Sequence, residues 1–166
     1  MRVRILWFVV IFFTSTGFDQ ASKQWARETL HPGVAEPVIT GYWDWQLAKN
    51  PGAAFSTFAG DAHSTAVHVG FGVIAAIALI AIGLAAHRTL PEQRMRRIAY
   101  ALLAGGALGN LIDRIATGDV TDFVRWHLHD HMWPIFNVAD ASLLAGAVLL
   151  LVEAWRVKSR YRAPAA

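Results

Sequence analysis

Long apolar runs alternate with polar segments along the chain, and this pattern predicts four membrane-spanning helices. Each run approaches the ~20 residues that an α-helix needs to cross ~30 Å of hydrocarbon. We expect the helices at about residues 5–25, 65–86, 98–116 and 135–156. Together they predict an all-α membrane protein, a four-helix bundle that forms one integral-membrane domain over residues 1–166.

The first apolar run has a second interpretation. Arg2 and Arg4 before a short apolar stretch are also typical of a secretory signal peptide. However, Thr14-Ser15-Thr16-Gly17 lacks a convincing small-x-small cleavage site, and the helical pattern continues through Trp25. We therefore interpret this run as a retained helix.

The basic residues orient the predicted helices. Ten of the 15 Lys and Arg residues lie at the amino end, in the short loop after the second helix and in the carboxyl tail: Arg2, Arg4, Arg88, Arg94, Arg96, Arg97, Arg156, Lys158, Arg160 and Arg162. Cytoplasmic loops carry the excess of basic residues. Both termini are therefore expected in the cytoplasm, and the two outer loops, at 26–64 and 117–134, on the opposite face.

The first outer loop has its own structural pattern. Between Glu36 and Phe58 it carries β-branched and aromatic residues, broken by Gly41 and by Pro51-Gly52. Such runs between turn residues are typical of short strands. We expect a small periplasmic β-element between the first and second helices.

Composition supports a polytopic membrane protein and excludes other classes. Apolar residues make up 55% of the chain and charged residues 16%. The net charge of +3, without a basic stripe, argues against a nucleic-acid partner. Because the chain has no cysteine, it has no disulfide, thiolate nucleophile or cysteine-ligated metal.

The third predicted helix combines small and polar residues. Gly105 and Gly109 form a small-xxx-small surface, which allows another helix to approach closely. Asn110 and Arg114 share one helical face beyond them, four residues apart. Asp113 is open to two interpretations, local pairing with an arginine or a chemical role.

Two aspartates flank the outer mouth of the last helices. Ionisable groups near a bilayer are costly, so Asp122 and Asp140 are candidates for function. Each has a structural alternative. Asn137 with Asp140 three residues later is also a helix-capping pattern, and Asp122 could be a solvated loop carboxylate.

At the end of the first helix, Asp19 and Lys23 are spaced as an acid-first i, i+4 pair. Exposed pairs of this kind contribute only a few tenths of a kcal/mol. At a membrane interface the same pair could instead order a functional mouth.

Five motifs in order resemble those of lipoprotein signal peptidase, also called signal peptidase II. They are Asp-Gln-Ala-Ser-Lys at 19–23, Asn-Pro-Gly-Ala-Ala-Phe-Ser at 50–56, Gly-Gly-Ala-Leu-Gly-Asn-Leu-Ile-Asp-Arg at 105–114, Val-Thr-Asp-Phe at 120–123 and Phe-Asn-Val-Ala-Asp at 136–140. Pro51 and Ala141 stand where this family more often has a small polar residue and Ser. The likeness covers nearly the whole chain.

The resemblance implies an aspartyl peptidase of the bacterial inner membrane, with its active site at the periplasmic face. Its substrates would be diacylglyceryl-modified prolipoproteins, cleaved before the lipidated cysteine. The family's catalytic aspartates match Asp122 and Asp140, and no cofactor or metal is implied. The expected supporting or substrate-binding residues are Asp19, Lys23, Asn50, Gly52, Asn110, Arg114 and Asn137. We expect the protein to be monomeric and to contact membrane lipid.

Paired carboxyl groups suit this chemistry. Without a metal, peptide hydrolysis needs one carboxylate to take a proton from water and one carboxylic acid to donate to the carbonyl oxygen. When two such groups are close, ionisation of one raises the pKa of the other, and the pair holds one proton.

Two rival functions remain open at this level. His127, His129 and His131 alternate as metal ligands on one side of a strand would, which allows a metal-binding membrane protein. A serine peptidase is the other rival, from Ser22 beside Lys23 or Ser142 near Asp140. Adjacent helical residues point about 100° apart, which disfavours Ser22 with Lys23.

Overall fold

The computed structural model describes residues 2–51, 65–90 and 92–162. Its helices are α1 (Arg2–Thr29), α2 (Thr65–His87), α3 (Arg94–Thr117) and α4 (Val138–Arg162). Each contains a segment long and apolar enough to cross a membrane. The four predicted helices are thus confirmed, with ends that differ from the expected ones by a few residues.

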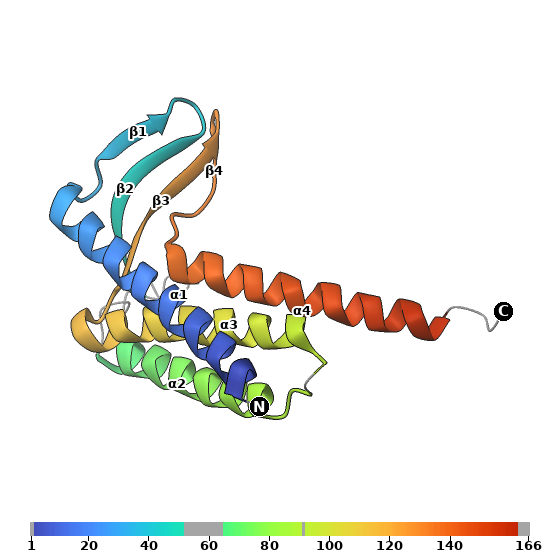
Figure 1. The fold of residues 1–166 in the computed structure, drawn as a ribbon. Coiled ribbons are helices and arrows are strands. Elements are labelled where there is room, and N and C mark those ends of the chain that lie inside the picture. The colour runs from blue at the N-terminus through green and yellow to red at the C-terminus, as the bar shows by residue number, and fades with distance from the viewer. Residues whose placement is uncertain (1, 52–64, 91, 163–166) are drawn as a thin grey trace.

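Helix α3 is the centre of the helical part, because α1, α2 and α4 all pack against it (Figure 1). Small residues make these contacts close. A Cβ atom on Gly105 would lie 2.9 Å from Ser15 Cβ of α1, and one on Gly106 would lie 2.5 Å from the Ala139 carbonyl oxygen of α4. The predicted small-residue surface therefore serves two neighbours, one on each side.

The structure corrects the all-α assignment and the position of the β-element. Four antiparallel strands form one sheet in the order β1 (Ala35–Ile39), β2 (Trp43–Asn50), β3 (Val120–Leu128), β4 (His131–Met132). Only β1 and β2 come from between α1 and α2. The other two come from the segment between α3 and α4, so the sheet joins both predicted outer loops.

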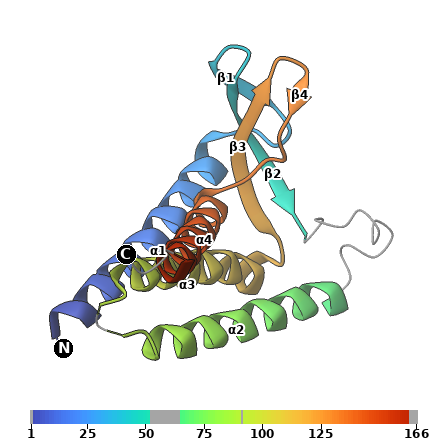
Figure 2. The ribbon, with the colours of Figure 1, turned by 90° about the vertical axis from the view of Figure 1, so that its right-hand side faces the viewer.

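The sheet stands at the end of the helices where α1 finishes and α4 begins (Figure 2). A small apolar core of Ala26, Leu30, Leu47 and Phe123 joins α1 to β2 and β3. Trp25 packs edge to face on Trp45, with ring centroids 5.2 Å apart. Burial of these apolar groups fixes the sheet on the helix end.

The chain passes from α3 into β3 through Gly118. This residue has φ 84°, and its N–H donates to the Arg114 carbonyl oxygen over 3.1 Å. A left-handed conformation after a helix favours glycine, which lacks the Cβ that would be strained there. The turn directs Val120–Leu128 along β2, with Asp122 opposite Ala48.

Candidate active site

Asp122 is the third residue of β3, and its side chain points into the structure with only 2% exposed. Both of its carboxyl oxygens accept hydrogen bonds from amide side chains. Asn137 Nδ2 donates to Oδ1 over 2.6 Å, and Asn50 Nδ2 donates to Oδ2 over 3.0 Å. The interpretation of Asp122 as a solvated loop carboxylate is therefore wrong.

Asp140 lies in the first turn of α4, where the helix dipole favours a negative charge. The predicted cap is present and reciprocal: Asn137 Oδ1 accepts the Asp140 N–H at 3.0 Å, and Asp140 Oδ2 accepts the Asn137 N–H at 3.3 Å. Asn137 also reaches Asp122, so capping and a link between the aspartates are two roles of one side chain.

Asn110 of α3 lies between the same elements. Its Nδ2 donates to Asp140 Oδ1 over 2.8 Å, and its Oδ1 accepts from Lys23 Nζ at 2.9 Å and from Asn137 Nδ2 at 3.2 Å. Amide side chains with one donor end and one acceptor end impose a direction on such a network. Asn110 and Asn137 thus connect Asp122 to Asp140 through hydrogen bonds.

Burial raises the pKa of Asp122 from its ordinary value to about 7, with the negative charge of Asp140 as the next cause. The hydrogen bonds from Asn50 and Asn137 act in the opposite direction and are outweighed. At neutral pH a substantial fraction of Asp122 therefore carries a proton beside a second carboxyl group. The pair is equipped for one group to donate a proton and the other to accept one.

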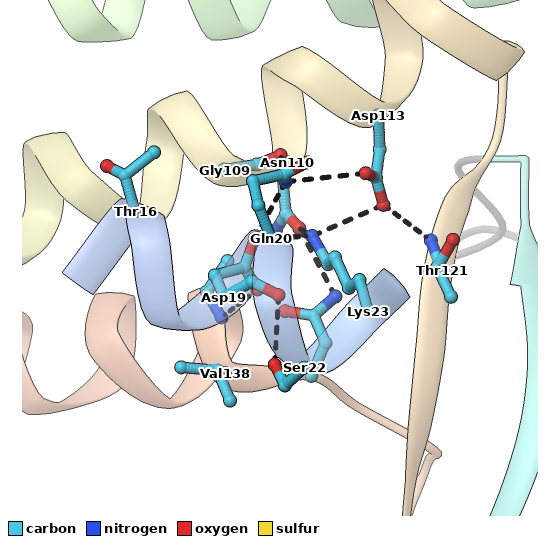
Figure 3. A network of polar contacts seen from close by, with 12 residues as sticks. Thr16, Asp19, Gln20, Ser22, Lys23, Gly109, Asn110, Asp113, Thr121 and Val138 are labelled. Atoms are coloured by element: carbon cyan, nitrogen blue, oxygen red, sulfur yellow. Dashed lines mark hydrogen bonds and ion pairs between the residues drawn. The ribbon is translucent and has the colours of Figure 1, made fainter. Parts of the chain in front are cut away.

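Asp19, Lys23 and Asp113 form a buried ion cluster (Figure 3). Lys23 Nζ is 2.9 Å from Asp19 Oδ2 and 3.3 Å from Asp113 Oδ2. The side chains of Asp19 and Lys23 are fully buried. The predicted i, i+4 pair is therefore present, but in the interior and not on an exposed helix surface.

Asp113 is the residue whose importance the sequence left open. It pairs with Lys23 and, at 3.7 Å, with Arg27, both on α1. It also accepts two hydrogen bonds: the backbone N–H of Thr121 donates to Oδ2 over 2.9 Å, and Gln20 Nε2 donates to Oδ1 over 3.4 Å. One feature of the sequence could have placed Asp113 at the site: it lies three residues after Asn110, on the same face of α3.

Arg114 and Gly52 complete the predicted set. Arg114 is half-buried; its Nη1 donates to the Asn110 carbonyl oxygen over 3.3 Å, and its guanidinium carbon lies 5.7 Å from the centre of the Phe71 ring. It is within electrostatic range of both Asp140 and Asp122. Gly52 lies outside the described residues.

The histidines of the metal-binding alternative serve separate contacts. His127 Nε2 lies 3.1 Å from Asp44 Oδ2, and the His129 ring packs on Tyr42 with centroids 6.0 Å apart. His131 is exposed on β4. Across residues 2–51, 65–90 and 92–162, no group of three or more His, Cys, Asp or Glu side chains is arranged to hold a metal ion.

The serines of the other alternative are also separated from a base. Ser22 Oγ donates to the Asp19 carbonyl oxygen over 2.9 Å, while Lys23 Nζ is turned toward Asp19, Asn110 and Asp113. Ser142 Oγ donates to the Val138 carbonyl oxygen over 2.9 Å. Within the part of the chain that the structure describes, neither hydroxyl is hydrogen-bonded to a base that could activate a serine nucleophile.

Comparison with known proteins identifies the family of this chain. The family model described as Signal peptidase (SPase) II matches residues 11–156. The Lipoprotein signal peptidase of Xanthomonas euvesicatoria pv. vesicatoria (strain 85-10) is 40% identical over 142 residues, which cover 82% of this chain and 78% of that protein. The Lipoprotein signal peptidase of Xylella fastidiosa (strain 9a5c) is 37% identical over 147 residues, covering 87% and 84%.

A solved structure described as "Bacterial membrane enzyme structure by the in meso method at 2.3 A resolution" also superposes on this fold. Its TM-score is 0.82, with 30% sequence identity and coverage of 96% of this chain and 93% of that one. The chain therefore shares its fold with a solved bacterial membrane enzyme. The chain belongs to the signal peptidase II family.

Proposed function

We propose that this protein is an aspartic endopeptidase that cleaves diacylglyceryl-modified prolipoproteins immediately before the lipidated cysteine. Family membership makes the chain a membrane peptidase that removes signal peptides from prolipoproteins. The aspartic mechanism and the position of the cleaved bond are the further steps proposed here, with Asp122 and Asp140 as the catalytic pair.

One observation carries the mechanism. Two aspartates from different elements, β3 and α4, are joined through Asn110 and Asn137, and the pKa of Asp122 is raised to about 7. A buried carboxyl group that keeps its proton up to about pH 7 beside a second carboxyl group is the arrangement that metal-free peptide hydrolysis needs.

In the proposed reaction, Asp140 takes a proton from a water molecule, and the oxygen of that water attacks the scissile carbonyl carbon. Asp122 donates its proton to the carbonyl oxygen, which gives a neutral tetrahedral diol. Asp140 then passes its proton to the leaving nitrogen, and Asp122 recovers a proton from one hydroxyl as the carbonyl reforms. The pair ends the cycle with the one proton that it held at the start.

The location of the pair suits a substrate anchored by acyl chains. Asp122 and Asp140 lie where the apolar helices meet the sheet, next to the first turn of α4. We place this end at the periplasmic face, with both termini in the cytoplasm, on the basis of the Lys and Arg distribution. We take the protein to be a monomer that contacts lipid and forms one domain over residues 1–166. In this arrangement the lipid tails of the substrate stay in the hydrocarbon, and the scissile bond reaches the aspartates.

The test uses the full chain in detergent with a diacylglyceryl-modified prolipoprotein, its unmodified precursor, and each reaction repeated with a chelator. Mass spectrometry of the products identifies the cleaved bond. We expect chelator-insensitive cleavage of the lipidated precursor alone, with diacylglyceryl-cysteine as the new amino terminus. Equal cleavage of both precursors, or cleavage at another bond, contradicts the proposed specificity, and loss of activity with chelator contradicts the metal-free mechanism.

A further inference from the structure

Two carboxylates outside the proposed catalytic pair face Lys23 from opposite sides, Asp19 on α1 and Asp113 on α3 (Figure 3). Their exposed fractions are 0% and 3%, and that of Lys23 is 0%. Buried ions without partners are strongly destabilising, and here each carboxylate is paired with the ammonium group of Lys23.

Each carboxylate has an oxygen bonded to a backbone amide. Asp19 Oδ1 accepts the N–H of Ala139 over 2.8 Å, and Asp113 Oδ2 accepts the N–H of Thr121 over 2.9 Å. Ala139 directly precedes Asp140, and Thr121 directly precedes Asp122. The cluster therefore binds the backbone one residue before each proposed catalytic aspartate. The bonds are charge-assisted hydrogen bonds, which are stronger than neutral ones.

Further contacts tie the cluster together. Lys23 Nζ also donates to Asn110 Oδ1, whose amide group in turn donates to Asp140. Gln20 Nε2 contacts Asp19 Oδ2 at 3.1 Å and the Gly109 carbonyl oxygen at 3.0 Å. These bonds fix α1 against α3 near the site. The backbone amides of Ala139 and Thr121 are therefore held at fixed positions relative to each other.

We propose that Asp19, Lys23 and Asp113 form a positioning unit that sets the spacing between the carboxyl groups of Asp122 and Asp140. This inference rests on the proposed function and assigns to the family's first-helix motif, together with Asp113, a geometric role. Lys23 joins the two carboxylates, and each carboxylate fixes one strand or helix start. In the proposed reaction both carboxyl groups must be aligned with the water and the scissile carbonyl, and a displacement of ~1 Å can lower a rate about 10²-fold.

The primary test replaces Asp113 in the full-length enzyme. Asp113→Ala removes the acceptor for the Thr121 amide, whereas Asp113→Asn keeps an oxygen that can accept it. We expect kcat to fall about 10²-fold in Asp113→Ala, with KM within about threefold of wild type, and most of the loss to be recovered in Asp113→Asn. A rise in KM at unchanged kcat would assign Asp113 to substrate binding and overturn the inference.

Asp44 provides the matched control for loss of a buried carboxylate. It is 7% exposed, lies on β2 and pairs with Arg125 and His127 at 3.9 and 3.1 Å. Asp44→Ala and Asp44→Asn should leave kcat within about threefold of wild type. If Asp113→Ala loses no more kcat than Asp44→Ala, Asp113 has no positioning role.

The rate of hydrogen exchange at the Thr121 amide gives a readout that does not depend on activity. We expect faster exchange at Thr121 in the Asp113 variants, and at Ala139 in Asp19→Asn, relative to the Asp44 variants. Because the unit acts on one pair, the double variant Asp19→Ala, Asp113→Ala should lose little more kcat than the worse single variant. Multiplicative losses would contradict a single unit.

Wild type and Asp122→Asn run in the same assay separate the two proposals. Cleavage by wild type that Asp122→Asn abolishes, together with wild-type kcat in the Asp113 variants, overturns the positioning unit alone. If wild type fails to cleave, the proposed function fails, and Thr121 exchange still decides whether Asp113 holds that amide. If Asp113→Ala does not fold, hydrogen exchange at Thr121 decides: exchange in Asp113→Asn that is no faster than in Asp44→Asn overturns the positioning unit.

Discussion

Asn137 donates from Nδ2 to Asp122 Oδ1 over 2.6 Å, which links the start of α4 to the start of β3. The other end of the same amide accepts the N–H of Asp140. Asn137 is fully buried, so water cannot replace either bond at low cost. One side chain thus caps a helix and joins both aspartates of the proposed pair.

The two roles of Asn137 are separable by substitution. Serine is a good helix cap but cannot reach Asp122 with an amide donor, whereas alanine does neither. We expect Asn137→Ser and Asn137→Ala to lower kcat by similar factors, about 10²-fold, and only Asn137→Ala to lose about 1 kcal/mol more through the cap. Steady-state cleavage and unfolding in detergent measure the two effects. Full activity of Asn137→Ser would show that the bond to Asp122 is dispensable.

The raised pKa of Asp122 predicts the alkaline limit of activity. Above about pH 7 this carboxyl group loses the proton that the carbonyl oxygen must receive, so kcat/KM should fall about tenfold per pH unit there. Asn50 lowers the pKa through its hydrogen bond, and its removal should move the falling limb to higher pH. A pH profile of Asn50→Ala with the limb unchanged, or moved to lower pH, would contradict this assignment.

The same shift predicts how stability depends on pH. The pKa of Asp122 rises from 3.8 to about 7 on folding, so between these values the folded state holds a proton that the unfolded chain has lost. The resulting stabilisation is complete below the lower value and is lost as pH rises through the upper one. The unfolding temperature should therefore fall between about pH 4 and 7. Asp122→Asn, which cannot ionise, should show a smaller fall over this range; an identical fall would place the effect elsewhere.

Gly109 should be intolerant of any side chain. A Cβ atom there would collide with the carboxylate of Asp19, which is itself held by Lys23 and Ala139. We expect Gly109→Ala to destabilise the protein by about 1–3 kcal/mol and to reduce cleavage. Gly83→Ala on α2 is the control, because a Cβ atom there meets nothing within 4 Å. Equal stability of the two variants would show that α1 can move away from α3 without cost.

The helices and the proposed catalytic residues were predictable because their signals are local. A membrane span needs a continuous apolar run, and such runs gave four helices that the structure confirms. Gly105 and Gly109 likewise predicted a close helix contact from spacing alone. Asp122 and Asp140 were identified through motifs of a few residues, although their separation and environment were not.

The sheet and the buried ion cluster were less accessible because their partners are distant in the chain. Strand β3 carries β-branched and aromatic residues, a strand signal, yet it pairs with β2 from the other outer loop. Asp19 and Asp113 bond to backbone N–H groups, which every residue except proline has and no motif marks. Which amide they take follows only from the folded arrangement.

The central claim is that Asp122 and Asp140 work as one pair, and single-turnover cleavage of the lipidated precursor tests it most directly. The variants Asp122→Asn, Asp140→Asn and the double variant keep the side-chain shape and remove one or both carboxylates. We expect each single variant to abolish measurable cleavage while remaining folded, and the double variant to be no worse, because the two groups act as a unit. Retention of wild-type cleavage by either single variant would contradict the claim.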